Sequence, residues 1–112
     1  MKKFLEINNY TFLTKVANTS FEKKYGLMFN INPEILAFEY SEPKINKIWM
    51  KNTFVPLAIV FAAQNRIVDI CQGQPLDLTV IGPDCATDLI VEFPLEMFNT
   101  LSLSVNDYIK LS

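Results

Sequence analysis

The residues best suited to chemistry in this chain are three polar residues in one short segment and a glutamate far from them in the sequence. Lys51, Asn52 and Thr53 follow the only tryptophan, Trp49, in the segment WMKNT, directly before the apolar run FVPLAIVFAA. Glu92 lies near the end of another apolar run, LIVEF. A charged side chain among apolar ones normally has a partner, so we expect Lys51 and Glu92 to form an ion pair if their strand ends are neighbours.

This polar corner supports three interpretations. In the first, the ion pair only fixes strand register, while the two residues after the lysine satisfy backbone groups in a turn. In the second, a small anionic or polar ligand contacts residues 51–53 beside an apolar wall formed by Trp49 and Met50. The third is proton transfer by Lys51 or Glu92, but it requires a nucleophile or a metal that the sequence does not offer, so no catalytic residue is assigned. The predicted ligand-binding residues are Trp49, Lys51, Asn52, Thr53 and Glu92.

The composition predicts a folded domain and argues against a general nucleic-acid binder. Half of the 112 residues are apolar, 20% are charged, and the formal net charge is -2. Disordered chains combine low hydrophobicity with high charge, and this chain shows neither. The length fits one domain, residues 1–112. Nucleic-acid binders normally carry a basic patch, whereas the one local basic pair here, Lys23 and Lys24, is expected to be a solvated helix face.

The absence of histidine and the presence of only two cysteines limit metal and nucleophile chemistry. Cys71 and Cys85 do not form a C-x-x-C pair, so a zinc site would need other ligands. We expect two free thiols; a disulfide is the first alternative, and a catalytic thiol would have no histidine to activate it. The aspartates lack the D-x-D-x-D-G spacing of a calcium loop. No metal and no cofactor is therefore predicted.

The first ten residues, MKKFLEINNY, contain two lysines but an apolar run of only Phe4 and Leu5. That run is far shorter than the apolar region of a signal peptide. We expect either a cytoplasmic protein or a mature, exported form whose leader has been removed. The longest nearly uninterrupted apolar run, residues 54–63, is far shorter than the ~20 residues of a membrane-spanning helix. It therefore predicts a buried strand and no membrane span.

Alternating and helical periodicities predict about eight strands and two short helices. Thr19 and Glu22 match a capping box, which satisfies free N–H groups at a helix start, and they predict a helix within residues 18–29. Pro94, at a position where a missing N–H does no harm, predicts a second helix over residues 94–101. The predicted strands cover residues 4–7, 11–17, 35–40, 45–51, 56–63, 67–72, 88–93 and 107–111.

The predicted strand over residues 56–63 is the most apolar segment of the chain. Its alternate positions are apolar on both faces, which is typical of a central strand covered on both sides. Hairpin connections dominate and no β-α-β rhythm appears, so we expect a largely antiparallel sheet. The sequence therefore predicts an α+β fold, with a small barrel-like, largely antiparallel β-sheet and two short helices.

Several segments follow one another in a fixed order: YGLMF (25–29), ILAF (35–38), WMKNT (49–53), Pro56-Leu57, LIVEF (89–93) and VNDYIKL (105–111). Together they resemble a known bacterial and archaeal family, domain of unknown function 192, from about residue 10 to the end. The resemblance implies a compact, β-rich α+β domain, and the family has no established activity. Many members carry an export signal or a lipid anchor, and we expect neither within residues 1–112. Lys51 and Glu92 both match family positions.

Two positions depart from the family pattern. The resemblance implies an arginine at position 30 and an aspartate at position 58, where this chain has Asn30 and Ala58. A buried carboxylate without its partner is costly, so the loss of two opposite charges together is a coherent change. We expect that this chain keeps the scaffold, has an altered polar site beside residues 49–53, and lacks any family chemistry that needs the aspartate.

We therefore predict an uncharacterised binding or accessory module with a polar pocket near Trp49–Thr53. Its predicted partner is a small polar or anionic ligand, or else a protein. One alternative is an interaction module that docks a partner through a strand edge or an apolar patch. A second alternative is a hydrolase or lyase of unknown substrate, although the available residues favour a protein that is not an enzyme.

Overall fold

The computed structural model describes all residues, 1–112, and contains seven strands and two short helices. All seven strands belong to one sheet, in the order β5-β4-β6-β3-β2-β1-β7. The helices are α1 (Ser20–Tyr25) and α2 (Leu95–Asn99). The strands are β1 (Lys2–Ile7), β2 (Tyr10–Ala17), β3 (Leu36–Ile45), β4 (Leu57–Ala63), β5 (Arg66–Gly73), β6 (Ala86–Pro94) and β7 (Ile109–Leu111).

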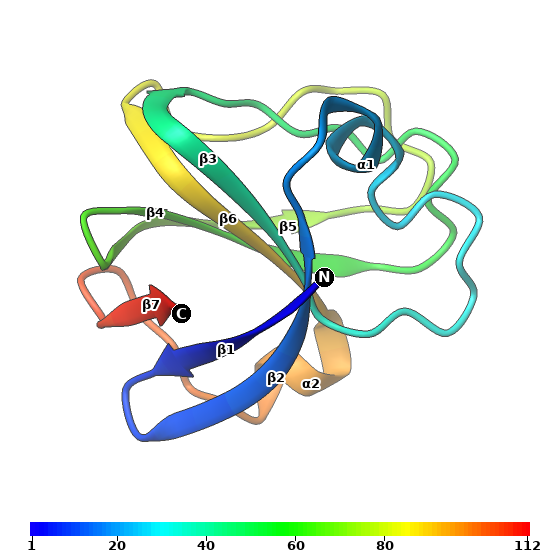
Figure 1. Ribbon diagram of the computed structural model, residues 1–112. Coiled ribbons are helices and arrows are strands. Elements are labelled where there is room, and N and C mark those ends of the chain that lie inside the picture. Colours follow the sequence, from blue (N-terminus) through cyan, green and yellow to red (C-terminus); the bar gives the residue numbers. More distant parts are fainter.

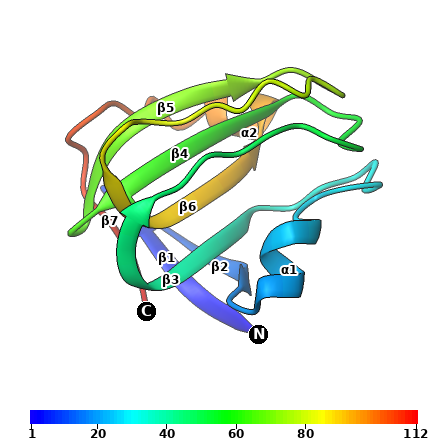
Figure 2. The same ribbon diagram turned by 90° about the horizontal axis from the view of Figure 1, so that it is seen from above.

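The sheet curls into a barrel-like shape, which confirms the predicted α+β fold (Figure 1, Figure 2). All neighbouring strand pairs are antiparallel except β2 and β3, which run parallel. The two ends of the strand order approach each other where the residues before β7 meet the start of β5. There the Ile67 amide donates to the carbonyl oxygen of Asp107 (3.0 Å), and Arg66 forms a β-bridge with Tyr108. This contact covers part of an otherwise exposed sheet edge.

Two apolar cores lie on opposite faces of the sheet, and β4 contributes to both because successive side chains of a strand alternate between faces. Ala58 and Val60 face the inside of the curl, where they meet buried residues from most other strands. Ile59 and Phe61 face outward, toward a second core that includes residues of the loops after β3 and β5 and of the segment after α1. Because β4 pairs with β5 on one side and β6 on the other, the predicted central strand is confirmed.

The two helices begin where the sequence predicts. The Thr19 hydroxyl accepts a hydrogen bond from the Glu22 amide (3.1 Å), and the Glu22 carboxylate accepts one from the Thr19 amide (3.2 Å). The predicted capping box is therefore present. α2 starts at Leu95, within one residue of the predicted start, with Pro94 as its N-cap, and it ends at Asn99 rather than at residue 101. Neither helix is both long enough and apolar enough to cross a membrane.

The strand predicted over residues 45–51 is wrong, and the structure has seven strands rather than eight. β3 instead continues beyond the predicted end at residue 40 to Ile45, with a bulge between Glu39 and Lys44. The buried Asn46 side chain then donates hydrogen bonds to the carbonyl oxygens of Lys44 (3.0 Å) and Thr87 (3.2 Å). These bonds take the place of ladder pairing, so the chain leaves the sheet and runs over its outer face as an irregular segment.

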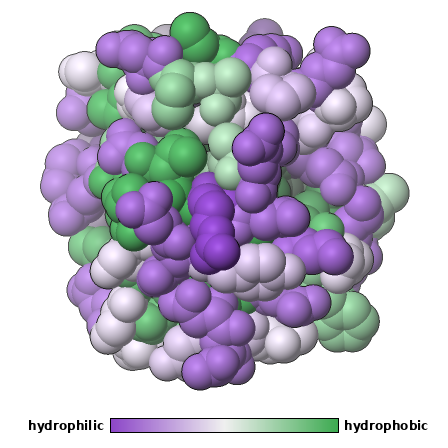
Figure 3. Space-filling view, turned by 90° about the vertical axis from the view of Figure 1, so that its left-hand side faces the viewer, coloured by the Kyte–Doolittle hydropathy of each residue, from purple (hydrophilic) through white to green (hydrophobic).

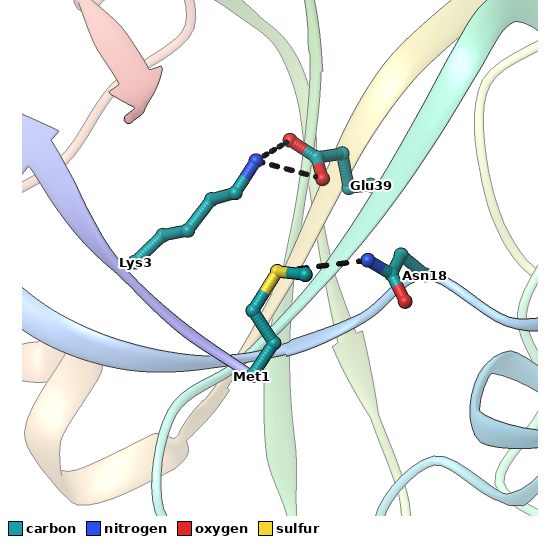
Figure 4. A network of polar contacts seen from close by, with 4 residues as sticks. All are labelled: Met1, Lys3, Asn18 and Glu39. Carbon is teal, nitrogen blue, oxygen red and sulfur yellow. Dashed lines mark hydrogen bonds and ion pairs between the residues drawn. The ribbon is translucent and has the colours of Figure 1, made fainter.

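An ion pair connects β1 to β3 across the intervening β2 (Figure 4). The Lys3 ammonium lies 2.8 Å and 3.0 Å from the two carboxylate oxygens of Glu39. Both side chains are 32% exposed, so the pair stabilises the fold by at most ~1 kcal/mol. The Asn18 amide also donates to the sulfur of Met1 (3.6 Å). Together these contacts hold the start of the chain beside the residues that precede α1.

The side of the molecule that faces away from α1 is largely polar. Purple side chains cover much of this face, and green patches lie between them (Figure 3). Five of the seven exposed aromatic side chains gather instead on α1 and on the segments that follow α1 and β3. They are Phe21, Tyr25, Phe29, Trp49 and Phe54.

Candidate functional site: a cleft above a buried carboxyl group

A cleft of about 180 Å³ opens on the outer face of the sheet, between the segment that follows α1 and the segment that follows β3. In Figure 2, α1 lies on one side of this region and the loop that leads from β3 to β4 lies on the other. The side chain of Glu92, from β6, contributes to the cleft together with the ring of Phe38, from β3. Other polar and aromatic residues that line it are Lys23, Lys24, Tyr25, Lys47, Trp49 and Thr53.

Glu92 is the only buried ionisable residue of the chain, with 4% of its surface exposed. In β6 it lies between Leu36 of β3 and Ile59 of β4, so apolar side chains surround it. Its Oε1 atom has no hydrogen-bond partner. Burial raises the pKa of the Glu92 carboxyl to about 8, because the charged form loses its hydration. The group is therefore mostly protonated at pH 7 and can donate a hydrogen bond.

Gly26, in the segment YGLMF, forms part of the cleft wall above this carboxyl group. Its backbone has φ 53° and ψ -130°, a conformation that residues with a side chain rarely adopt. A Cβ atom at this position would lie 3.4 Å from the Phe38 ring and 3.7 Å from Oε1 of Glu92. Glycine is therefore the residue that lets the chain turn this close to the carboxyl group without filling the space above it.

The WMKNT segment forms a tight turn on the opposite wall. The Thr53 amide donates to the carbonyl oxygen of Met50 (3.1 Å), and Asn52 has φ 54°, which fits a type II turn. The Asn52 carbonyl oxygen accepts a hydrogen bond from the amide of Phe29 (2.8 Å), and this bond joins the two walls of the cleft. Met50 is buried against Gly73, where an added Cβ would lie 2.5 Å from the methionine sulfur. The packing of Met50 and the hydrogen bond to Asn52 thus hold the turn in place.

The five residues predicted to bind a ligand lie in two adjoining places. Trp49, Thr53 and Glu92 line the cleft. Lys51 and Asn52 line a neighbouring hollow, which Trp49 also borders. The Thr53 hydroxyl donates to the carbonyl oxygen of Lys51 (3.2 Å), so the turn itself already satisfies this hydroxyl.

The predicted ion pair between Lys51 and Glu92 is wrong. The two ion pairs of the structure join other residues, and Lys51 is exposed. Its ammonium lies 5.1 Å from the centre of the Trp49 ring, a cation–π contact at the surface. The reason is the turn over residues 50–53, in which Lys51 and Asn52 are the two central residues. The prediction treated residues 45–51 as a strand, whereas this turn leaves the Lys51 side chain exposed.

Three lysines at the cleft were not predicted as site residues. Lys23 and Lys24 come from α1, and Lys47 comes from the segment after β3. The Lys47 ammonium is already bonded to Asp84 (2.8 Å), whereas that of Lys23 lies 4.0 Å from the centre of the Tyr40 ring. The signal for Lys23 and Lys24 was their place in FEKKYG, separated from Gly26 only by Tyr25. The prediction treated these two lysines as a solvated helix face.

The two departures from the family pattern lie outside the cleft, contrary to the expectation that they alter a polar site beside residues 49–53. Ala58 is buried on the inner face of the sheet, the face opposite to Glu92. The side-chain oxygen of Asn30 accepts a hydrogen bond from the amide of Asn32 (3.0 Å) within its own loop. Neither residue lines the cleft.

Both cysteines are free thiols. Burial and the neighbouring carboxylate of Asp69 raise the pKa of the Cys71 thiol to about 11, so this thiol is a weak nucleophile at neutral pH. Cys85 is exposed. The structure has no group of three or more Cys, Asp or Glu side chains arranged to hold a metal ion.

The fold and the cleft define a class of protein: a small, barrel-like α+β domain with one buried carboxyl group between a glycine turn and a W-M-K-N-T turn. The chain belongs to the DUF192 family, described as "Uncharacterized ACR", whose family profile matches residues 3–111. The resemblance seen in the sequence is thus confirmed.

Two solved structures share this fold. A protein of unknown function from Novosphingobium aromaticivorans DSM 12444 has a TM-score of 0.87 and 25% sequence identity, over 96% of this chain and 83% of that chain. A protein from Sinorhizobium meliloti 1021, described as a candidate transcription regulator, has a TM-score of 0.91 and 20% identity, over 99% of this chain and 94% of that chain. At 20% identity, the similarity to this second structure shows only that the two proteins share a fold. No curated protein matches the sequence.

Proposed function

We propose that this chain binds a small oxyanion, such as a carboxylate, in the cleft beside Glu92. The observation that carries the proposal is the unpartnered Oε1 atom of a buried carboxyl group that lines an open cleft. Leaving a buried polar group without a hydrogen bond costs about 1–3 kcal/mol. Such groups are rare in folded proteins, and an ordered water, an ion or a ligand commonly supplies the missing partner.

The charges at the cleft favour an anion over a cation. Lys23 and Lys24 bring positive charge to the rim, and Glu92 is the only acidic residue among the lining residues. When protonated, Glu92 donates a hydrogen bond to a ligand oxygen, and a hydrogen bond to an ionised oxygen is among the stronger kinds. A cation would instead lie beside ammonium groups and a mostly neutral carboxyl group.

The size of the cleft limits the group that enters it. Its volume of about 180 Å³ resembles that of an engineered cavity of about 150 Å³ that holds benzene. A group of roughly six non-hydrogen atoms therefore fits. The exposed face of Trp49 supplies an apolar wall for the carbon part of such a group.

Acetate titrations between pH 6 and 9.5, followed by amide chemical shifts, test the proposal. Binding to the natural protein should weaken as the pH rises through about 8, because Glu92 ionises and repels the anion. Glu92→Gln keeps a hydrogen-bond donor but does not titrate, so its affinity should be independent of pH in this range. Glu92→Leu, which has no donor, should bind acetate weakly at every pH.

Lysine variants provide the matched control. Lys24→Gln should weaken acetate binding, whereas Lys110→Gln, an exposed lysine on β7, should not. Circular dichroism confirms that each variant is folded. Absence of acetate binding at pH 6, or equal binding by Glu92→Leu and the natural protein, would show that the cleft does not use the carboxyl group to hold an anion.

A hydrolase or lyase is the second candidate, because a glutamate with a pKa of about 8 is suited to general acid–base catalysis near neutral pH. The cleft offers no second carboxylate and no cysteine to share the chemistry. An acid–base role would appear as turnover that Glu92→Gln abolishes while ligand binding persists. Binding without turnover in the natural protein favours the first proposal.

A further inference from the structure

A second hollow, of about 240 Å³, adjoins the Glu92 cleft on the side of α1. Tyr25, Met28, Trp49 and Lys24 line both spaces. The cleft and this outer hollow therefore form one groove with two unlike ends. The inner end carries the buried carboxyl group, and the outer end is bordered mainly by aromatic side chains and the stems of lysines.

The aromatic side chains of the outer hollow are unusually exposed. Phe21 is 73% exposed and Tyr25 is 47% exposed, and their rings stack with centres 5.8 Å apart. Trp49, which borders both parts of the groove, is 43% exposed. Aromatic rings gathered on a surface mark a binding site more often than rings that are scattered singly.

From this arrangement we propose that the groove binds an organic acid with a flat, apolar body. The carboxylate end lies in the Glu92 cleft, which is the oxyanion site proposed above and on which this inference rests. The body of the ligand lies in the outer hollow, against the rings of Trp49 and Tyr25. Aromatic faces favour flat apolar groups, which stack on them or meet them edge-on.

Charge and size both support this class of ligand. Lys24 and Lys51 border the outer hollow and no acidic residue does, so an anionic ligand meets favourable charge along the whole groove. The inner cleft, at about 180 Å³, is smaller than the roughly 300 Å³ at which ligand pockets begin. The cleft and the outer hollow together reach that range, which indicates a ligand longer than the carboxylate group alone.

Two acids that differ by one benzyl group test the inference. The affinities of acetate and of 3-phenylpropionate are measured at pH 6 by isothermal titration calorimetry. Burying a phenyl ring should make 3-phenylpropionate bind at least about tenfold more tightly than acetate. Phe21→Ala, whose side chain lines the outer hollow and not the cleft, should remove much of this gain and leave acetate binding unchanged. Phe4→Ala, at an exposed aromatic residue of β1, is the matched control and should change neither affinity.

The outcomes separate this inference from the proposed function. If acetate binds and 3-phenylpropionate binds no more tightly, the inference is overturned while the oxyanion site stands. If neither acid binds, both proposals fail. If ultracentrifugation shows a dimer that Phe21→Ala dissociates, and 3-phenylpropionate does not compete with it, the outer hollow is an interface with a second copy and the inference is overturned.

Discussion

Replacing Glu92 with glutamine should stabilise the protein at alkaline pH and have little effect at acid pH. Glutamine has nearly the same shape as glutamate but does not ionise. The pKa of the Glu92 carboxyl is about 8 in the folded protein, against an ordinary value of 4.5. Because one pKa unit corresponds to about 1.4 kcal/mol, the ionised carboxylate lowers the free energy of unfolding by on the order of 5 kcal/mol above pH 8.

The sign follows from the protons that each state binds. Between pH 4.5 and 8, the folded protein holds a proton on Glu92 that the unfolded chain has released. The stability contributed by this group is therefore fully present below pH 4.5 and is lost as the pH rises through about 8. Asp77, Asp84 and Glu22 have lowered pKa values, so they titrate at lower pH and affect the natural protein and the variant alike.

Urea unfolding at a series of pH values measures this difference. The fluorescence of Trp49, the only tryptophan, and far-ultraviolet circular dichroism report the transition. The unfolding free energies of the variant and the natural protein should diverge progressively from acid to alkaline pH. Glu96→Gln, an exposed glutamate on α2, is the matched control and should not change the pH dependence. A constant difference between Glu92→Gln and the natural protein from pH 5 to pH 9 would show that the folded state holds no such proton.

Three further variants and reactions test other parts of the site. Gly26→Ala should destabilise the fold by about 1–3 kcal/mol in urea unfolding, because its φ of 53° is strained for alanine; an unchanged midpoint would contradict the observed turn. Gly73→Ala should also cost about 1–3 kcal/mol by overpacking against Met50, and a Met50→Ala background should reduce this cost if the two residues are in contact. At pH 8, a thiol reagent should modify Cys85 rapidly and Cys71 slowly, as peptide mapping would show, because the pKa of Cys71 is raised to about 11. Equal rates would refute that ordering.

Local patterns predicted most of the fold correctly. The Thr19–Glu22 capping box and the β4–β5 hairpin depend on neighbours in the sequence, so their residue types were sufficient to predict them. The path after β3 was not predicted because it depends on a distant contact: the Asn46 side chain bonds to Thr87, 41 residues away. An apolar pattern over residues 45–51 gave no sign of that bond.

The candidate site was predicted in part, and for a similar reason. Trp49, Thr53 and Glu92 stand out because polar and aromatic residues interrupt apolar runs, and the structure places them at one cleft. The assumed strand gave Lys51 the wrong direction, because periodicity does not reveal the positive φ of Asn52. The contribution of α1 to the rim depends on tertiary packing, which the helix pattern alone did not reveal.

The presence of a buried acid at position 92 favours the proposed binding role of the cleft over a purely structural role. An apolar residue would fit between Leu36 and Ile59 without the cost of a buried acid, and replacing buried charged groups by apolar ones is often stabilising. The surrounding turns also leave a cleft beside the buried carboxyl group: Gly26 has no side chain to fill it, and Asn52 joins its two walls through one backbone hydrogen bond. A purely structural corner would close over an apolar side chain. This corner instead keeps a protonated acid at an open cleft, beside lysines that favour an anion.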